Sequence, residues 1–351
     1  MFGYLSLRCR LESLIRRIGQ SWQILRRGDA YIEDRWMPYE REMIAVQEGI
    51  AKHRAMSLTS SEATAEYRLR RNIHRIEKGI AVADGKRAFA EDYLGDTVCI
   101  LSNLLHSMTG CHGDNWELTT WAIRILDQYF AVVPQTEIIM SEKVRYRNLR
   151  HSIIHGLLPR VSRGQLIEKD PDTQKLFEDM MRKRHSVRQY LEKPVGRGVI
   201  DKAVEIARLA PSACNRQAFF YHIFDYAEDV ENIRKLTYGI SCFSDYIPGI
   251  ALLIGTYDAY EYEYDRHLPF VDASLSAMCF VQALWCEGVG SCFINWPDSN
   301  EYAQGLKEIV NLEPWHLPIM AITYGYPSNE YYVPESVRKS VNAMRSYHKK
   351  G

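Results

Sequence analysis

The chain lacks several features that would place it in a functional class at once. Lys and Arg number 44 and Asp and Glu also 44, so it has no excess positive charge of the kind expected of a nucleic-acid binder. No apolar run has the length of a membrane span, and the longest, around residues 247–255, is broken by Pro248 and Gly249 and predicts a buried strand. The N-terminus shows no signal-peptide pattern. We therefore expect no nucleic-acid partner, no integral membrane segment and no secretion.

Paired cysteine motifs are also missing. Eight cysteines are scattered through the sequence without a CxxC pair, which predicts neither a zinc site nor a disulfide framework. We expect a cytoplasmic protein without a metal, whose cysteines are mostly buried free thiols. A dinucleotide-binding glycine fingerprint and internal repeats are absent as well. A nicotinamide cofactor, if used, is therefore expected to bind only transiently.

The chain divides into two parts by its sequence pattern. Residues 1–160 predict a helical N-terminal domain of unknown role, and the Gly-, Pro- and charge-rich segment 156–172 predicts a linker. Helices and strands alternate in residues 172–351, which predicts an α+β domain with a central sheet flanked by helices around a buried helix. Asp272 is expected to cap that helix, which is nearly all apolar over residues 273–287.

Two basic segments of the N-terminal part allow two interpretations each. The stretch RRNIHRIEKG, residues 70–79, is either an anion-binding helix or, as we favour, a charged solvated face opposite an apolar stripe. The segment from Arg8 to Arg27 is either a helix on an acidic membrane surface or, as we favour, a packed terminal helix.

A short basic loop carries the first chemical signal. In RKRHSVRQY, residues 182–190, Arg184, Ser186 and Arg188 alternate along an extended segment, so their side chains are expected on one face. Two guanidinium groups and a hydroxyl can satisfy the oxygens of a phosphate. A solvated basic loop is the alternative.

Three further stretches add to this signal. APSACNRQ, residues 210–217, presents Ser212, Asn215 and Gln217, which either read the edge of a planar heterocycle or only cap a turn. GVGSCFINWPD, residues 288–298, has a tight glycine turn that allows a ligand to approach the backbone. YGYPSNEYYVPESVRKS, residues 324–340, places Arg338 and Lys339 after the last predicted strand.

In this order and spacing, the four stretches resemble the nitroreductase-like family of FMN-dependent oxidoreductases over roughly residues 172–345. The basic loop followed by Pro194 and Val195 resembles the family motif that binds the FMN phosphate and ribityl chain. The segment 211–217 resembles the motif beside the flavin ring, and the arginine of the tail is expected to return to the phosphate. The cofactor-binding residues that the resemblance implies are Arg184, His185, Ser186, Arg188, Pro211, Ser212, Ala213, Asn215, Gln217, Ile294, Asn295, Arg338 and Lys339.

Some positions differ from the family pattern. Ala218 and Phe219 stand where the family usually has Pro-Trp, which affects the substrate side of the site. The stretch EYEYDRHLPF, residues 261–270, does not match the substrate lid of the iodotyrosine deiodinase branch, which disfavours halotyrosine dehalogenation. His185 either donates to the cofactor or fills the loop. No catalytic acid or base is identified.

The resemblance implies an FMN-dependent oxidoreductase of nitroreductase type. It would transfer a hydride from NAD(P)H (NADH or NADPH) through FMN to a small-molecule acceptor, as a homodimer. Two alternatives stay open. One is a non-enzymatic FMN-binding sensor or scaffold, and the other is a flavin-dependent oxidase of a metabolite or peptide presented by the N-terminal domain.

Overall fold

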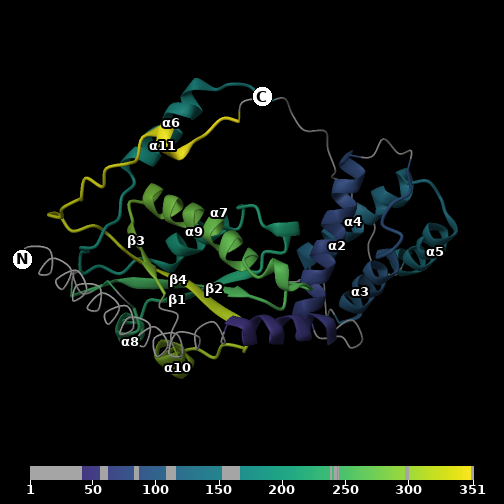
Figure 1. Cartoon of the computed structure of the whole chain (residues 1–351), viewed down its shortest axis with the longest axis horizontal. Helices are drawn as coiled ribbons and strands as arrows, with labels where there is room; N and C mark the ends of the chain where they lie inside the picture. Colours follow the sequence, from purple (N-terminus) through teal and green to yellow (C-terminus); the bar gives the residue numbers. More distant parts are fainter. Residues whose placement is uncertain are drawn as a thin grey trace, which may run out of the picture.

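The structure is a computed structural model, and it shows an α+β protein. It describes residues 42–55, 62–82, 87–107, 116–151, 167–237, 239–240, 243, 245–296 and 300–348. Strands occur in the C-terminal part, whereas the described residues before 152 form helices and the segments that connect them (Figure 1). The fold class predicted from the sequence is therefore confirmed.

One antiparallel sheet forms the centre of the C-terminal part. Its strands are β1 (Phe219–Phe224), β2 (Gly249–Thr256), β3 (Gly290–Asn295) and β4 (His316–Gly325). Their order is β1-β2-β4-β3, and each neighbouring pair is antiparallel. Every residue of β2 is buried, which requires cover on both faces of the sheet.

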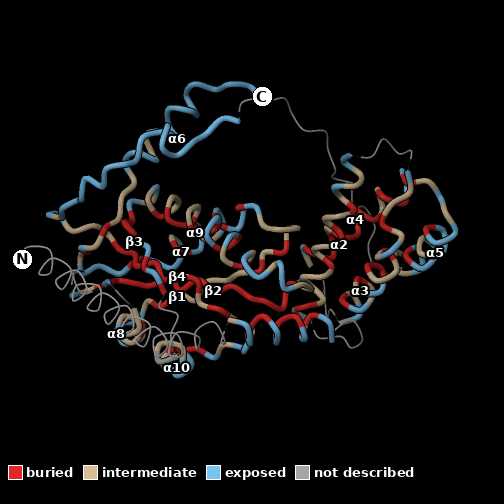
Figure 2. The backbone as a smooth tube through the Cα atoms, in the orientation of Figure 1, coloured by how far each residue is buried: buried red, intermediate tan, exposed pale blue. Residues whose placement is uncertain are grey.

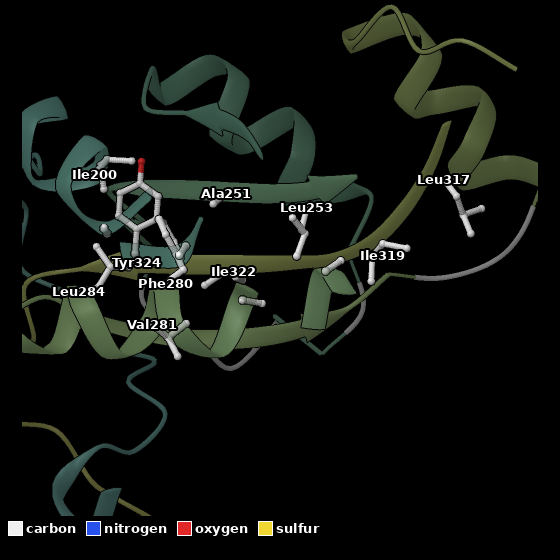
Figure 3. Packing of buried hydrophobic residues seen from close by; sticks show 14 of the residues in the cluster. Ile200, Ala251, Leu253, Phe280, Val281, Leu284, Leu317, Ile319, Ile322 and Tyr324 are labelled. Carbon is white, nitrogen blue, oxygen red and sulfur yellow. The ribbon is translucent and has the colours of Figure 1, made fainter. Parts of the chain in front are cut away.

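Helices supply this cover. On one face lie α7 (Arg197–Ala207) and α9 (Leu268–Cys286), and Phe280 and Leu284 of α9 join Ala251 and Leu253 of β2 in one core (Figure 3). On the other face, α8 (Ala227–Lys235) and α10 (Asn300–Ile309) pack against the alternate residues of β2. Both cores draw on β2 because successive side chains of a strand point to opposite faces.

The central helix α9 begins earlier than the sequence predicted. It starts at Leu268, and Pro269 lies in its first turn, where a missing backbone N–H costs nothing. Asp272 is therefore not a cap, which corrects our expectation; it is buried and accepts a hydrogen bond from the Ala213 N–H at 3.0 Å. By length and composition alone, residues 263–286 are apolar enough to cross a membrane. The contacts of α9 with α7 and the sheet instead mark it as a core helix.

The N-terminal part has an apolar core of its own. Its helices are α2 (Glu62–Val82), α3 (Leu94–Ser107), α4 (Trp116–Val132) and α5 (Glu137–His151). Leu69, Ile73 and Ile76 of α2 are fully buried there against α3 and α4, as the apolar stripe of α2 predicts. The helix over residues 42–55 differs, because Ala45, Val46 and Ile50 join the core between the sheet and α9.

Polar contacts join these helices to the segment after β2. His53 Nδ1 lies 2.8 Å from the Asp258 carbonyl oxygen, and the Thr64 hydroxyl donates to the Asp258 carboxylate at 3.1 Å. Arg71 Nη1 donates to Glu261 at 2.9 Å. Gly49 packs so closely that an added Cβ would lie 2.5 Å from Tyr257 Cβ. The two-domain division stays a prediction, and these contacts indicate that its parts are in intimate contact.

Two segments of the C-terminal part, one at its beginning and one at its end, lie apart from the apolar cores. α6 (Pro171–Lys183) and α11 (Val341–Met344) bury no residue, and Figure 2 shows the tail as an almost continuous exposed strip. Leu176 and Phe177 of α6 are 72% and 56% exposed, and Tyr332 of the tail is 93% exposed. Exposed apolar segments of this kind are typical of surfaces that contact a second chain.

Some expectations are corrected or fall outside the described residues. Among the five described cysteines only Cys292 is buried, so the expectation of mostly buried thiols is wrong for this part of the chain. The basic segment 8–27 lies outside the described residues, as does most of the predicted linker. Within the described ranges, no group of three or more His, Cys, Asp or Glu side chains is arranged to hold a metal ion.

Candidate functional site

The basic loop takes the extended form that its sequence predicts. Arg184 follows the last residue of α6 with φ −63° and ψ 125°. Val187 is fully buried, and its N–H donates to the Ser291 carbonyl at 3.0 Å. Gly290 permits this contact, because a Cβ there would lie 2.6 Å from the Val187 side chain. Arg184, Ser186 and Arg188 remain half-buried beside Val187.

The C-terminal tail meets this loop. The Leu191 N–H donates to the Tyr326 carbonyl at 2.9 Å, and the Ser328 N–H donates to the Gln189 carbonyl at 3.0 Å. Beyond these contacts, the tail, the loop and α6 border an open cavity of about 770 Å³. We call it the arginine cavity, and the predicted site residues that line it are Arg184, His185, Ser186, Arg188 and Arg338. Lys339 is exposed and does not line it.

The arginine cavity carries unbalanced positive charge. Four arginines line it, Arg182 being the fourth, against two glutamates, Glu178 and Glu335. No carboxylate among the described residues forms an ion pair with Arg184 or Arg188. Half-buried guanidinium groups without a counter-ion favour binding of an anion. The donor set therefore fits a phosphate group.

His185 is engaged by the protein through both ring nitrogens. Nδ1 lies 2.7 Å from the Lys183 carbonyl oxygen and Nε2 lies 3.0 Å from the Tyr331 hydroxyl. The ring also stacks on Tyr331 and meets the edge of Trp285 at 4.9 Å between centroids. A neutral imidazole satisfies this arrangement, with Nδ1–H donating and Nε2 accepting. The geometry favours the interpretation in which His185 fills the loop. The sequence did not identify Tyr331 and Trp285 as its neighbours.

Behind the loop, β3 begins at a tight turn. Gly288 has φ +73°, a conformation that glycine adopts without strain, as the sequence predicted for this turn. Burial raises the pKa of the Cys292 thiol, and the nearby Arg188 opposes this shift. Cys292 of β3 is therefore a protonated core residue at neutral pH.

The amide loop, residues 210–217, has a strained backbone. Cys214, Asn215 and Gln217 all have positive φ values, between 53° and 54°. The Ser212 hydroxyl accepts from the Gln217 N–H, and Asn215 Oδ1 accepts from Gln217 Nε2, both at 3.0 Å. Left-handed non-glycine residues cost about 1–3 kcal/mol each and are concentrated at functional sites. The turn-capping alternative explains part of this geometry but not the repeated strain.

Contacts with the N-terminal end of α9 hold the amide loop in place. Asp272 accepts from the Ala213 N–H, and burial raises the pKa of this carboxyl while that hydrogen bond and Arg216 oppose the rise. Arg216 is only 4% exposed; it lies over the Tyr260 ring and 3.7 Å from Asp265. Asn215 and Gln217 line a different cavity from the arginines, one shared with α2 and α4.

The end of β3 carries a third group of predicted site residues. Phe293 and Asn295 face outward, whereas Ile294 is 5% exposed and belongs to the core under the sheet. Together with Ser274 and Met278 of α9, they line a shallow hollow of about 440 Å³. The Ile294 side chain therefore packs inside, and its backbone is the part that a ligand at this hollow would meet.

The predicted site residues thus gather at three places. Ser186 pairs with Ser291 at the start of β3, so the arginine cavity and Asn295 lie roughly 13 Å apart along one strand. His185 contacts Trp285 near one end of α9, whereas Ala213 bonds Asp272 near the other. The basic loop and the amide loop of one chain are therefore about 20 Å apart along α9.

The C-terminal part is similar in sequence to known proteins. The family model described as "Nitroreductase family" matches residues 181–241, which contain both the basic loop and the amide loop. A protein of Archaeoglobus fulgidus named "Putative NADH dehydrogenase/NAD(P)H nitroreductase" is 24% identical over 152 residues, which is 43% of this chain and 85% of that protein.

Solved structures are similar over the same part. An FMN-dependent nitroreductase from Clostridium difficile is 21% identical with a TM-score of 0.39, covering 45% of this chain and 91% of that one. A nitroreductase family protein from Streptococcus pneumoniae is 23% identical with a TM-score of 0.41, covering 49% and 100%. The resemblance that the motifs predicted is confirmed over residues 181–241, where the family model matches.

Proposed function

We propose that the C-terminal part binds FMN and works as an oxidoreductase of nitroreductase type. The observation that carries this proposal is the arginine cavity, where Arg184 and Arg188 have no carboxylate partner among the described residues and Arg338 joins them from the tail. The family match supports the same cofactor class. Arg184, Ser186, Arg188 and Arg338 would hold the phosphate.

The distance along β3 supports this placement. A flavin whose phosphate lies in the arginine cavity can extend along β3 toward Phe293 and Asn295, roughly 13 Å away. The open hollow there is lined by Phe293, Met278 and Met320, which suit the face of an apolar ring system. The backbone at Ile294 and Asn295 would meet the polar edge of the ring.

A homodimer is part of the proposal. The amide loop of one chain is about 20 Å from its own basic loop along α9, so a second copy is its natural source at a shared site. The outer face of α9 supports this, because Val271 and Leu275 are 49% and 44% exposed at helical spacing. The exposed apolar residues of α6 and the tail suit the same interface.

In the reaction that we propose, NADH or NADPH binds transiently and reduces the flavin. When bound, FMN supplies the ring that accepts and passes on the hydride. The protein's own residues would bind and orient: the arginines hold the phosphate, and the amides of Asn215 and Gln217 face the ring's polar edge. No described residue is assigned as a catalytic acid or base. The five described cysteines are free, in keeping with a reducing, cytoplasmic setting.

An absorption spectrum of the purified chain tests the cofactor. We expect a flavin spectrum, with FMN alone released on denaturation; finding only FAD, or a colourless protein that ignores added FMN, would refute the proposal. Steady oxidation of NADH or NADPH with a nitroaromatic acceptor tests the activity. Tight FMN binding without turnover for any acceptor would favour the sensor or scaffold alternative.

A further inference from the structure

The second large cavity lies between the N-terminal helices and the amide loop. Its volume is about 710 Å³, within the range of small-molecule sites. We call it the junction cavity, and the residues used below are Arg70 of α2, Trp121 of α4, Arg208 after α7, and Asn215 and Gln217 of the amide loop. Packing of α2 on the amide loop brings these two distant parts of the sequence together (Figure 1).

Arg70 is held in position for a ligand. Glu66 engages Nε and Nη2 of Arg70, each at 2.9 Å, and both side chains are largely buried. Nη1 has no hydrogen-bond partner among the described residues. A guanidinium that is fixed on one edge and open on the other suits an anionic oxygen.

A second guanidinium adds to the charge of the junction cavity. Arg208 lies 3.7 Å from Glu117, and both side chains are exposed, so this ion pair is weak and easily exchanged for a ligand carboxylate. Two arginines therefore face one glutamate in the lining. Glu66 already pairs with Arg70, so the positive charge open to a ligand is the Nη1 edge of Arg70 together with the exposed Arg208, and these donors favour an anionic oxygen.

The remaining walls suit a planar group. The indole of Trp121 is half-buried, and its Nε1–H donates to Glu77 at 3.2 Å, which fixes the ring. Asn215 and Gln217 have their side-chain amides joined to each other. An aromatic surface and fixed amides in one lining are suited to a flat conjugated ring.

We propose that the junction cavity is the acceptor site and that the N-terminal helices build it for an aromatic acid, with Arg70 and Arg208 binding its carboxylate. This inference rests on the proposed function, because the amide loop is the element expected beside the flavin ring. It gives the N-terminal part a role: α2 and α4 determine which acceptor reaches the flavin.

Direct binding tests the inference on the full chain loaded with FMN, so that the arginine cavity is filled. We choose 4-nitrobenzoate and its neutral analogue 4-nitrobenzamide as probes, titrated calorimetrically without reductant. The wild type should bind 4-nitrobenzoate about tenfold more tightly, since a charge-assisted hydrogen bond is worth about that factor. Arg70→Met should abolish the preference.

Arg208→Met gives a second variant that keeps the fold, because this side chain is 60% exposed. It should reduce the preference, and Arg147→Met, an exposed arginine of α5 outside the cavity, should retain it in full. Equal affinity for both probes in the wild type, no binding of either, or an unchanged preference in both cavity variants would overturn the inference.

Turnover with NAD(P)H separates this inference from the proposed function. Reduction of both probes without any dependence on Arg70 or Arg208 would leave the function standing and refute the junction cavity as acceptor site. The expected binding pattern without any reduction would refute the oxidoreductase function and leave an aromatic-acid site.

Discussion

Arg188 and Arg338 line the same cavity, although one lies in the basic loop before α7 and the other in the exposed tail after β4. The tail reaches this position because it is hydrogen-bonded to the loop at Tyr326 and Ser328. Two segments at opposite ends of the C-terminal part therefore line one cavity, which we propose as the phosphate site.

Arg338→Ala should weaken FMN binding about as much as Arg188→Ala. Loss of a charge-assisted hydrogen bond costs on the order of 1.5–3 kcal/mol, or roughly tenfold to a hundredfold in affinity. Fluorescence titration of the apoprotein with FMN measures this. Arg345→Ala is the matched control, because Arg345 bonds only Tyr347 and Asn342 within the tail and does not line the cavity. Equal FMN affinity in wild type and Arg338→Ala would contradict the prediction.

Gly290→Ala should displace the basic loop. An added Cβ would lie 2.6 Å from the Val187 side chain, which is fully buried, so the loop must move away from β3. We expect FMN affinity to fall about tenfold or more, since the arginines shift with Val187. Gly198→Ala is the control, because nothing lies within 4 Å of a Cβ at this position of α7. Unchanged FMN affinity in Gly290→Ala would show that the loop position does not matter.

The basic loop could be predicted from the sequence because a local pattern determines it, whereas the return of the tail to this loop was expected only from the family resemblance. Alternation of polar residues around Val187 predicts an extended segment with one buried and one open side. The buried strand β2 was also predicted, because the apolar run around residues 247–255 is long enough for a strand and is broken by Pro248 and Gly249. The start of α9 was missed because Asp272 resembles an N-cap, while its actual partner, the Ala213 N–H, comes from a distant loop.

The junction cavity could not be predicted from the sequence. Arg70 and Trp121 lie on helices whose polar faces look solvated when each helix is considered alone. Only the packing of α2 on the amide loop, a long-range contact, places them around one cavity. The segment 70–79 was thus interpreted as a solvated face, although Arg70 is largely buried in its ion pair with Glu66.

Stability should fall as the pH drops below about 6.5. Burial lowers the pKa of His222 and also that of His316, so the folded chain takes up protons at these two side chains only at a lower pH than the unfolded chain does. The unfolded chain, with ordinary histidine pKa values near 6.5, takes up protons that the folded chain does not, which favours unfolding at low pH. Above that range both states are neutral, and these residues contribute no pH dependence.

Urea denaturation at pH 7.5 and at pH 5.5 measures this effect. His222→Phe should lose less stability than the wild type between the two pH values, because Phe220 and Phe224 already surround the position. His267→Gln, at an exposed histidine before α9, should behave like the wild type. An identical pH dependence in His222→Phe would contradict the assignment.

Limited proteolysis should cut within the predicted linker, residues 156–172, and yield two fragments on a denaturing gel. We expect the fragments to stay together under native conditions. Residues 42–55 contribute to the core between the sheet and α9, and His53 and Arg71 bond the segment after β2. Size-exclusion chromatography of the nicked protein measures this association. Separation of the fragments without denaturant would show that the junction is weak.

The last prediction concerns the shared flavin site. If two copies build it, the basic loop comes from one chain and the amide loop from the other, so each loop can be inactivated in a different chain. Arg188→Ala and a double variant, Asn215→Ala with Gln217→Ala, should each bind FMN poorly. When the two are unfolded, mixed and refolded, a mixed dimer has one site with both loops intact. Random pairing restores about a quarter of the sites with wild-type affinity.

Light scattering should show a dimer throughout. Refolding of each variant alone is the control, and restored binding there would be an artefact of refolding. A monomer with full FMN occupancy would contradict the prediction, and so would a mixture that binds FMN no better than its two components. Either result would mean that both loops serve a site within one chain, despite their separation along α9.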